Sequence, residues 1–291
     1  MDINRILCPV DLSEMSAHAV DLAIVVAGYY NARLTALHVV SPTEPSVDEA
    51  ALEDRRQETV SFVSRAAAPR IDVDVMVDVG QPARGILDRA ASLPADLIVM
   101  GTHGRSGFEH LVLGSVAEKV LRQAACPVLT VPPGAVTTRA TLPLARLLCA
   151  VDFSDGSESA LRAALSLSEQ SGAHLTLLHV LEWPWVEPPA PAIEDLPPAQ
   201  GLALAEFRRY TEDSARHRLE SLVPKSAPLS RVATRLVSGK PYARILDVAA
   251  EEGSDLIILG VRGRQPLDLA LFGSTANHVV RRATCAVLTT R

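Results

Sequence analysis

The stretch GTHGRSGFEHLVLGS, residues 101–115, indicates most clearly how this chain folds. It follows an apolar run, Asp96–Met100, that has the composition of a buried parallel strand. It precedes an amphipathic run, Ser115–Gln123, that has the periodicity of a helix. The sequence therefore predicts a strand, a glycine loop and a helix in direct succession.

The glycines of this loop suit the approach of a ligand. Gly101 and Gly104 allow the backbone to bend with positive φ and to come close to a bound group. Gly114 and Ser115 place free N–H groups and a hydroxyl at the start of the helix. Because a helix N-terminus carries partial positive charge, we expect it to favour an anion.

The same pattern returns in the second half as GVRGRQPLDLALFGS, residues 260–274, again after an apolar run, Asp255–Leu259. Both copies have the spacing Gly-x2-Gly-x9-Gly-Ser, so chance is a poor explanation. Other segments repeat as well: Leu147–Asp152 resembles Ile6–Asp11. The chain is therefore predicted to be a tandem repeat with domains at 1–133 and 144–291 and a linker at 134–143.

The second half contains an insertion of about 18 residues near WPWVEPPAPAIEDLPPAQ, residues 183–200. It holds six of the twenty prolines and both tryptophans, so we expect neither regular helix nor interior strand there. It is either a surface loop whose tryptophans cover a local patch, or a lid or partner-binding segment.

Composition limits the classes of function. At 291 residues the chain has room for about two domains. The net charge of -6 argues against a sequence-independent nucleic-acid binder, and no apolar run reaches the ~18 residues of a membrane span. Cys8 and Cys126 match Cys149 and Cys285 beside apolar runs, which indicates buried thiols in a reducing compartment. We expect a cytoplasmic protein without membrane or nucleic-acid partners.

Strands alternate with helices in each half, which predicts an α/β fold with parallel sheets covered on both faces. In the first half we expect strands at 5–10, 33–40, 71–79, 96–101 and 127–131, separated by helices at about 13–30, 47–67, 83–92 and 115–123. Ligands of such folds bind outside the carboxyl ends of the strands, where the strand order reverses. If the first and fourth strands are neighbours, Asp11 and the Gly101 loop share this crevice.

With these residues the chain resembles a tandem universal stress protein. The resemblance covers nearly everything except the insertion and the linker. It implies two doubly wound five-stranded sheets of strand order 3-2-1-4-5, joined through the fifth strands at 127–131 and 286–290, with whole chains pairing again as a homodimer. ATP-binding members carry the same glycine loop, so the resemblance implies ATP as the ligand, with Mg²⁺ on its phosphates.

The resemblance also implies which residues contact the nucleotide. In the first half these are Pro9, Val10, Asp11 and Val39 for adenine and ribose, and Met100, Gly101, His103, Gly104, Gly114, Ser115 and Val116 for ribose and phosphates. The second-half equivalents are Ala150, Val151, Asp152, Val180, Leu259, Gly260, Arg262, Gly263, Gly273, Ser274 and Thr275. Arg105 and Arg264 follow the second glycine of each loop and suit phosphate contact or simple exposure. Arg262 in place of His103 and Ala150 in place of Pro9 indicate that the second pocket differs in affinity.

Structural roles remain open for several of these residues. Asp11 and Asp152 also suit helix capping beside Ser13 and Ser154. His38 and His179 are expected to pack at strand ends rather than to catalyse.

The expected function is that of an ATP-binding, non-enzymatic regulator of the stress response. Two alternatives remain open: a slow ATPase or adenylyl-transfer enzyme, for which only His103 is a candidate base, and a nucleotide-free interaction module working through residues 183–200. The sequence shows no Walker loop, no Gly-x-Gly-x-x-Gly after the first strand and no metal-ligand spacing of Cys and His.

Overall fold

The computed structural model describes residues 2–43, 48–66, 71–103, 113–133, 144–182, 198–224, 231–261 and 272–291. The elements of the first half are β1 (Arg5–Val10), α1 (Glu14–Tyr30), β2 (Arg33–Val40), α2 (Glu49–Ala66), β3 (Val73–Val79), α3 (Pro82–Ser92), β4 (Leu97–Gly101), α4 (Ser115–Gln123) and β5 (Val128–Val131). Those of the second half are β6 (Arg146–Ala150), α5 (Asp155–Ser171), β7 (His174–Leu181), α6 (Pro198–Ser221), β8 (Val232–Ser238), α7 (Pro241–Glu252), β9 (Leu256–Gly260), α8 (Ser274–Arg282) and β10 (Ala286–Thr290).

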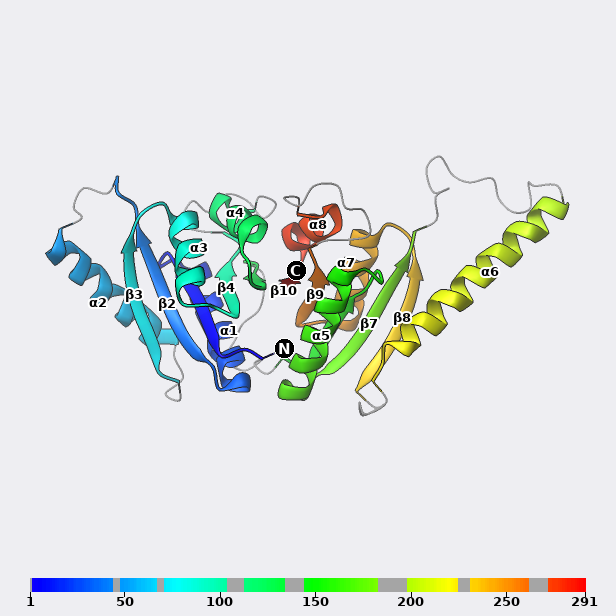
Figure 1. The fold of residues 1–291 in the computed structure, drawn as a ribbon, viewed down its shortest axis with the longest axis horizontal. Coiled ribbons are helices and arrows are strands. Elements are labelled where there is room, and N and C mark those ends of the chain that lie inside the picture. The colour runs from blue at the N-terminus through cyan, green and yellow to red at the C-terminus, as the bar shows by residue number, and fades with distance from the viewer. Residues whose placement is uncertain are drawn as a thin grey trace.

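The strands form one sheet in the order β3-β2-β1-β4-β5-β10-β9-β6-β7-β8 (Figure 1). Each half contributes five parallel strands in the order 3-2-1-4-5, which confirms the predicted fold class. The halves join where β5 and β10 pair antiparallel, at the position expected for the fifth strands. Two buried threonines repeat across this seam: Thr130 Oγ1 donates to Val287 O at 3.2 Å, and Thr289 Oγ1 donates to Val128 O at 3.1 Å.

The helices cover both faces of the sheet. Helices α1, α2, α5 and α6 contribute to one hydrophobic core, and α3, α4, α7 and α8 contribute to the other. Because both faces are covered, the central strands are apolar along their whole length, as in the LIVM run of β4. Helices α1 and α5 lie side by side behind the seam, where the Tyr30 and Ser166 hydroxyls are 3.0 Å apart.

The start of each fourth strand is held by an aspartate. Asp96 Oδ2 accepts hydrogen bonds from the N–H groups of Asn4 and Arg5 at 2.8 and 3.0 Å. Asp255 Oδ2 accepts from Ala145 and Arg146 in the same way, both at 2.8 Å. The repeat therefore extends to the contacts that fix the alignment of β1 with β4 and of β6 with β9.

The expectation of a non-helical insertion is wrong at its carboxyl end, because residues 198–200 form the first turn of α6. Proline is tolerated in a first turn, whose N–H groups have no intrahelical acceptor. Residues 183–197 and the predicted linker, 134–143, lie outside the described residues. Among the described helices, none combines the length and the apolar character needed to cross a lipid bilayer.

The four cysteines are free thiols, two buried and two partly buried. Burial raises the pKa of Cys8 and of Cys149 to about 12. It also raises the pKa of Cys126 to about 11 and that of Cys285 to about 12. Since only the thiolate is a strong nucleophile, these cysteines serve packing rather than chemistry.

Candidate functional site

The candidate site lies at the carboxyl ends of β1 and β4, where the strand order reverses. Strand β1 lies between β2 and β4, with Ile6 opposite Leu97 and Leu7 opposite Ile98. Continuing this parallel register places Asp11 opposite Thr102, directly after both strands. The predicted acid and the start of the glycine loop therefore share one crevice.

The start of α4 returns to the same point. The N–H of Gly114 donates to Thr102 O at 2.8 Å, and the N–H of Gly273 donates to Val261 O at 2.9 Å. The expectation that the Gly114 N–H is free is therefore wrong, because this N–H forms a hydrogen bond with the residue that follows β4. Gly114 is the N-cap residue of α4, and it makes no side-chain cap hydrogen bond because it has no side chain. The N–H groups of the first turn of α4, which begins at the exposed Ser115, can therefore donate to a ligand.

The reason for glycine at positions 101 and 260 differs from the prediction. Neither residue has positive φ, so the expected left-handed bend at Gly101 is wrong. A Cβ on Gly101 would lie 3.4 Å from Met15 O, and a Cβ on Gly260 would lie 2.6 Å from Gly156 C and O. Glycine suits both positions because the end of β4 packs against the backbone of the first turn of α1, and the end of β9 packs still more closely against that of α5.

Asp11 and Asp152 hold identical local structures. Asp11 Oδ1 accepts from the N–H and the hydroxyl of Ser13 at 3.1 and 2.5 Å. Asp152 Oδ1 accepts from Ser154 at 3.0 and 2.5 Å. The two serines are the N-caps of α1 and α5, so the aspartates support the caps without being caps themselves. Each carboxylate is therefore held in a fixed orientation directly after the first strand of its half.

The histidines of the second strands pack as expected. His38 is buried, and its Nδ1 lies 2.8 Å from Val10 O. His179 is also buried, and its Nδ1 lies 2.7 Å from Val151 O. Each ring thus ties the second strand to the end of the first.

Most of the predicted site residues come together at these two strand edges. The described ones are Pro9, Val10, Asp11, Val39, Met100, Gly101, His103, Gly114, Ser115 and Val116 in the first half, and Ala150, Val151, Asp152, Val180, Leu259, Gly260, Gly273, Ser274 and Thr275 in the second. Gly104, Arg105, Arg262, Gly263 and Arg264 lie outside the described residues.

Sequence reasoning missed Thr102. This buried residue places its Oγ1 2.9 Å from His103 Nδ1, and its N–H donates to Val131 O at 3.0 Å. The second half has Val261 at the equivalent position, so it lacks the hydroxyl that orients the neighbouring side chain. An alignment of the two loops could have indicated this difference, because the first loop has threonine beside histidine and the second has valine beside arginine.

A second difference between the halves is an arginine on α6. The Arg218 guanidinium lies 4.3 Å from the ring centroid of Phe153, which in turn packs on His179 with ring centroids 4.4 Å apart. The first half has Leu12 in place of Phe153, and both residues have positive φ, of 65° and 63°. The second half therefore has an aromatic and cationic contact beside His179 that the described residues of the first half do not repeat at Leu12.

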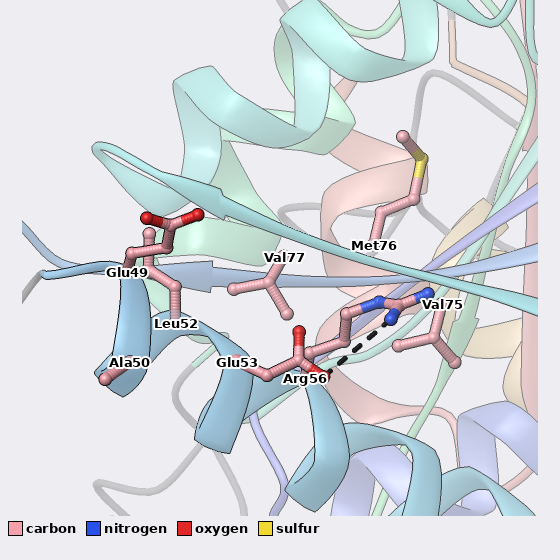
Figure 2. A pocket seen from close by; sticks show the side chains of 8 residues that line it. All are labelled: Glu49, Ala50, Leu52, Glu53, Arg56, Val75, Met76 and Val77. Carbon is pink, nitrogen blue, oxygen red and sulfur yellow. Dashed lines mark ion pairs between the residues drawn. The ribbon is translucent and has the colours of Figure 1, made fainter.

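A groove of about 800 Å³ lies elsewhere, between α2 and the edge strand β3 (Figure 2). Figure 2 shows Glu53 and Arg56 of α2 facing each other across a 4.0 Å ion pair, with Val75, Met76 and Val77 of β3 nearby. It contains none of the predicted site residues and brings together no catalytic or metal-ligating set. We therefore keep the strand-end crevice as the candidate site.

No group of three His, Cys, Asp or Glu side chains suited to a metal occurs among the described residues.

Comparison with known proteins identifies relatives for both halves. Residues 2–132 and 144–291 match the model of the Universal stress protein family. A universal stress protein of Methanocaldococcus jannaschii is 36% identical over 138 residues, covering 44% of this chain and 81% of the relative. One of Mycolicibacterium smegmatis is 26% identical over 304 residues, covering 98% and 96% of the two chains.

Solved structures show the same fold over the whole chain. A universal stress protein from Archaeoglobus fulgidus has a TM-score of 0.66 at 24% identity and covers 100% of this chain and 97% of its own. A putative universal stress protein from Pseudomonas aeruginosa has a TM-score of 0.69 at 19% identity, with coverage of 99% and 93%. At these identities the structures support the fold alone.

Proposed function

The chain belongs to the universal stress protein family, and from this premise we propose that it binds ATP in the crevice after β1 and β4 and acts as a nucleotide-dependent regulator of the stress response. The observation that carries the proposal is the convergence of a fixed carboxylate, Asp11, with the N-terminus of α4 at one strand-order reversal. A carboxylate suits ribose hydroxyls, and a helix N-terminus suits phosphates.

The residues present fit such a ligand. The backbone of Gly114 packs so closely that a Cβ would lie 3.0 Å from Thr102 O, so the start of α4 rests directly on the backbone that follows β4. Asp11 would accept hydrogen bonds from the ribose, and the N–H groups and hydroxyl at Ser115 would donate to phosphate oxygens. Mg²⁺ would enter with the phosphates, as no described cluster of side chains is built to hold it alone. In keeping with a regulator, we propose a cytoplasmic location.

Replacing Asp11 by asparagine tests the proposal. Asparagine keeps the oxygen that accepts from Ser13 but removes the negative charge, so the cap survives while a charge-assisted hydrogen bond to the ribose is lost. We expect ATP affinity to fall by about tenfold, measured by isothermal titration calorimetry.

Asp152→Asn is the matched structural control, because it changes the same contact to Ser154. Both variants should shift the melting temperature by similar amounts. Unchanged ATP affinity in Asp11→Asn, or an equal loss in Asp152→Asn, would contradict the proposed role of the Asp11 carboxylate.

Enzymatic turnover is the weaker alternative. The Nδ1 of His103 is engaged by Thr102, and the second half has arginine at the equivalent position, so a base beside the phosphates would exist in one half at most. We propose binding rather than catalysis as the primary activity.

A second candidate function, protein association, is favoured by α6. This helix reaches beyond the sheet on the side of β8 (Figure 1), and it exposes Leu202, Phe207 and Tyr210, which are 67%, 57% and 73% accessible. They follow the Trp183–Gln200 segment proposed from the sequence to bind a protein partner. We propose that whole chains pair through this surface as a homodimer.

Substituting Leu202, Phe207 and Tyr210 together by serine is expected to convert the dimer to a monomer, as measured by light scattering after gel filtration. Replacing the exposed polar residues Arg209, Glu212 and Asp213 of the same helix by serine is the control and should leave the dimer intact. A monomeric unmodified chain, or a dimer that survives the apolar substitutions, would contradict pairing through α6.

A further inference from the structure

A pocket of about 340 Å³ lies at the amino ends of β1 and β2, at the end of the sheet opposite to the candidate site. Arg5 and Arg33 are the first residues of these strands, and the parallel register places them opposite each other. Thr35 and Asp74, which are opposite each other in β2 and β3, also line the pocket. Its volume is near the lower end of the ~300–1,000 Å³ of small-molecule sites, so it suits a small ligand.

The two halves have different residues at the end of the helix that borders this place. Arg5 Nη1 donates to Leu93 O at 3.2 Å, and Arg146 Nη1 donates to Glu252 O at 2.9 Å. This repeated contact shows that Leu93 and Glu252 occupy equivalent positions. Leu93 packs against the apolar core on its side of the sheet, whereas the second half has a carboxylate here.

The Glu252 carboxylate turns back onto the strands of its own half. Its Oε2 accepts from Thr176 Oγ1 at 2.8 Å, and its Oε1 accepts from Arg235 Nη1 at 3.0 Å. The Glu252 side chain is 28% exposed in this position. Thr176 of β7 is the equivalent of Thr35 of β2. The second half therefore shows how a carboxylate is held over this threonine.

The first half has the donors for a carboxylate at this place but no glutamate to use them. Arg33 and Thr35 are two residues apart in β2, so their side chains leave the same face of the sheet. In the described part of the chain, neither the Thr35 hydroxyl nor the Arg33 guanidinium takes part in a hydrogen bond or an ion pair. A hydroxyl and a guanidinium are strong donors to a carboxylate.

The charge of the lining favours a ligand with a single negative charge. Two arginines and one aspartate, Asp74, leave a net charge of +1, which one carboxylate balances. A doubly charged anion such as phosphate would meet the Asp74 carboxylate as well. The Ser92 hydroxyl donates to Arg89 O at 3.0 Å. The other residues of the lining are Ile6, Leu7, Leu93, Pro94 and Ala95. Their apolar side chains suit a short aliphatic chain.

We propose that this pocket binds a small aliphatic monocarboxylate, whose carboxylate takes over Thr35 the place that the Glu252 carboxylate takes over Thr176. Arg33 of β2 supplies the guanidinium that Arg235 of β8 supplies in the second half. Only the first half takes this ligand, because the second half carries the carboxylate itself. The site is separate from the crevice after β1 and β4 and does not depend on ATP binding.

Saturation-transfer difference NMR of the full chain, with butyrate as the probe, tests the proposal. We expect saturable binding by the unmodified chain. Thr35→Val keeps the shape of the side chain but loses one hydrogen bond to a charged group, so it should raise the dissociation constant for butyrate about tenfold. Thr176→Val is the matched control, because Glu252 already occupies that place, and it should leave butyrate binding unchanged.

Leu93→Glu gives the first half the carboxylate that the second half has, and we expect it to remove butyrate binding. Ala91→Glu adds the same charge at an exposed position of α3 that does not line the pocket, so this control should bind butyrate like the unmodified chain.

Four results would overturn the proposal. They are no saturable binding of butyrate, equal losses in Thr35→Val and Thr176→Val, binding that persists in Leu93→Glu, and displacement of butyrate by an equal concentration of inorganic phosphate. Displacement of butyrate by ATP and Mg²⁺ would contradict a site separate from the nucleotide. Butyrate binding by a chain that binds no ATP would overturn the proposed function alone. Should either variant of the pocket fail to fold by circular dichroism, the other decides the question.

Discussion

Gly260→Ala is expected to lower the free energy of unfolding by about 3 kcal/mol, whereas Gly101→Ala at the equivalent position should cost less than about 1 kcal/mol. The cause is the distance to the backbone of the first turn of α5 at Gly260 and of α1 at Gly101. A Cβ on Gly260 would lie 2.6 Å from Gly156 C and O, a separation at which the backbone must move. At Gly101 the nearest atoms, His103 O and Met15 O, are 3.3 and 3.4 Å away.

Urea denaturation followed by circular dichroism measures this difference. The two substitutions are chemically identical and sit at equivalent places of the repeat, so each is the other's control. Equal losses at the two positions would show that α5 does not approach β9 more closely than α1 approaches β4.

Leu288→Asp is expected to be more damaging still, with a loss of about 4 kcal/mol in the free energy of unfolding. Leu288 is 4% exposed in β10 and pairs with Leu129 of β5 across the seam. A carboxyl group there loses its hydration without gaining a cation, and it removes apolar contacts on which both halves depend. Among the described strands, the two five-stranded units share a ladder at this seam alone.

Chemical denaturation of Leu288→Asp should therefore show a lower midpoint and a separation of the unfolding of the two halves. Val79→Asp in the edge strand β3 is the control, because Val79 is 47% exposed and its side chain remains hydrated. A midpoint unchanged by Leu288→Asp would contradict a continuous ten-stranded sheet.

The fold could be predicted from sequence because its signals are local and occur twice. Apolar runs such as Leu97–Met100 lack the alternating polar residues of a half-exposed strand, so they predict strands that are buried on both faces. Ser13 and Ser154 indicate helix starts, and the structure confirms both as N-caps. The pairing of β5 with β10 is not a local property. It was predicted from the resemblance to a family, and no periodicity of either strand indicates its antiparallel partner.

The parts of the site that the sequence did not predict depend on contacts between distant segments. Gly101 was expected to bend the chain, but its Cβ position instead faces the backbone at Met15, about ninety residues earlier. Such requirements appear only when the strand register and helix placement are known.

The central claim is that this chain binds ATP at the end of β1 and β4, and a calorimetric titration of the stripped, unmodified chain with ATP and Mg²⁺ tests it most directly. We expect saturable binding of ATP. Absence of binding would contradict it and would leave the exposed surface of α6 as the better candidate for function.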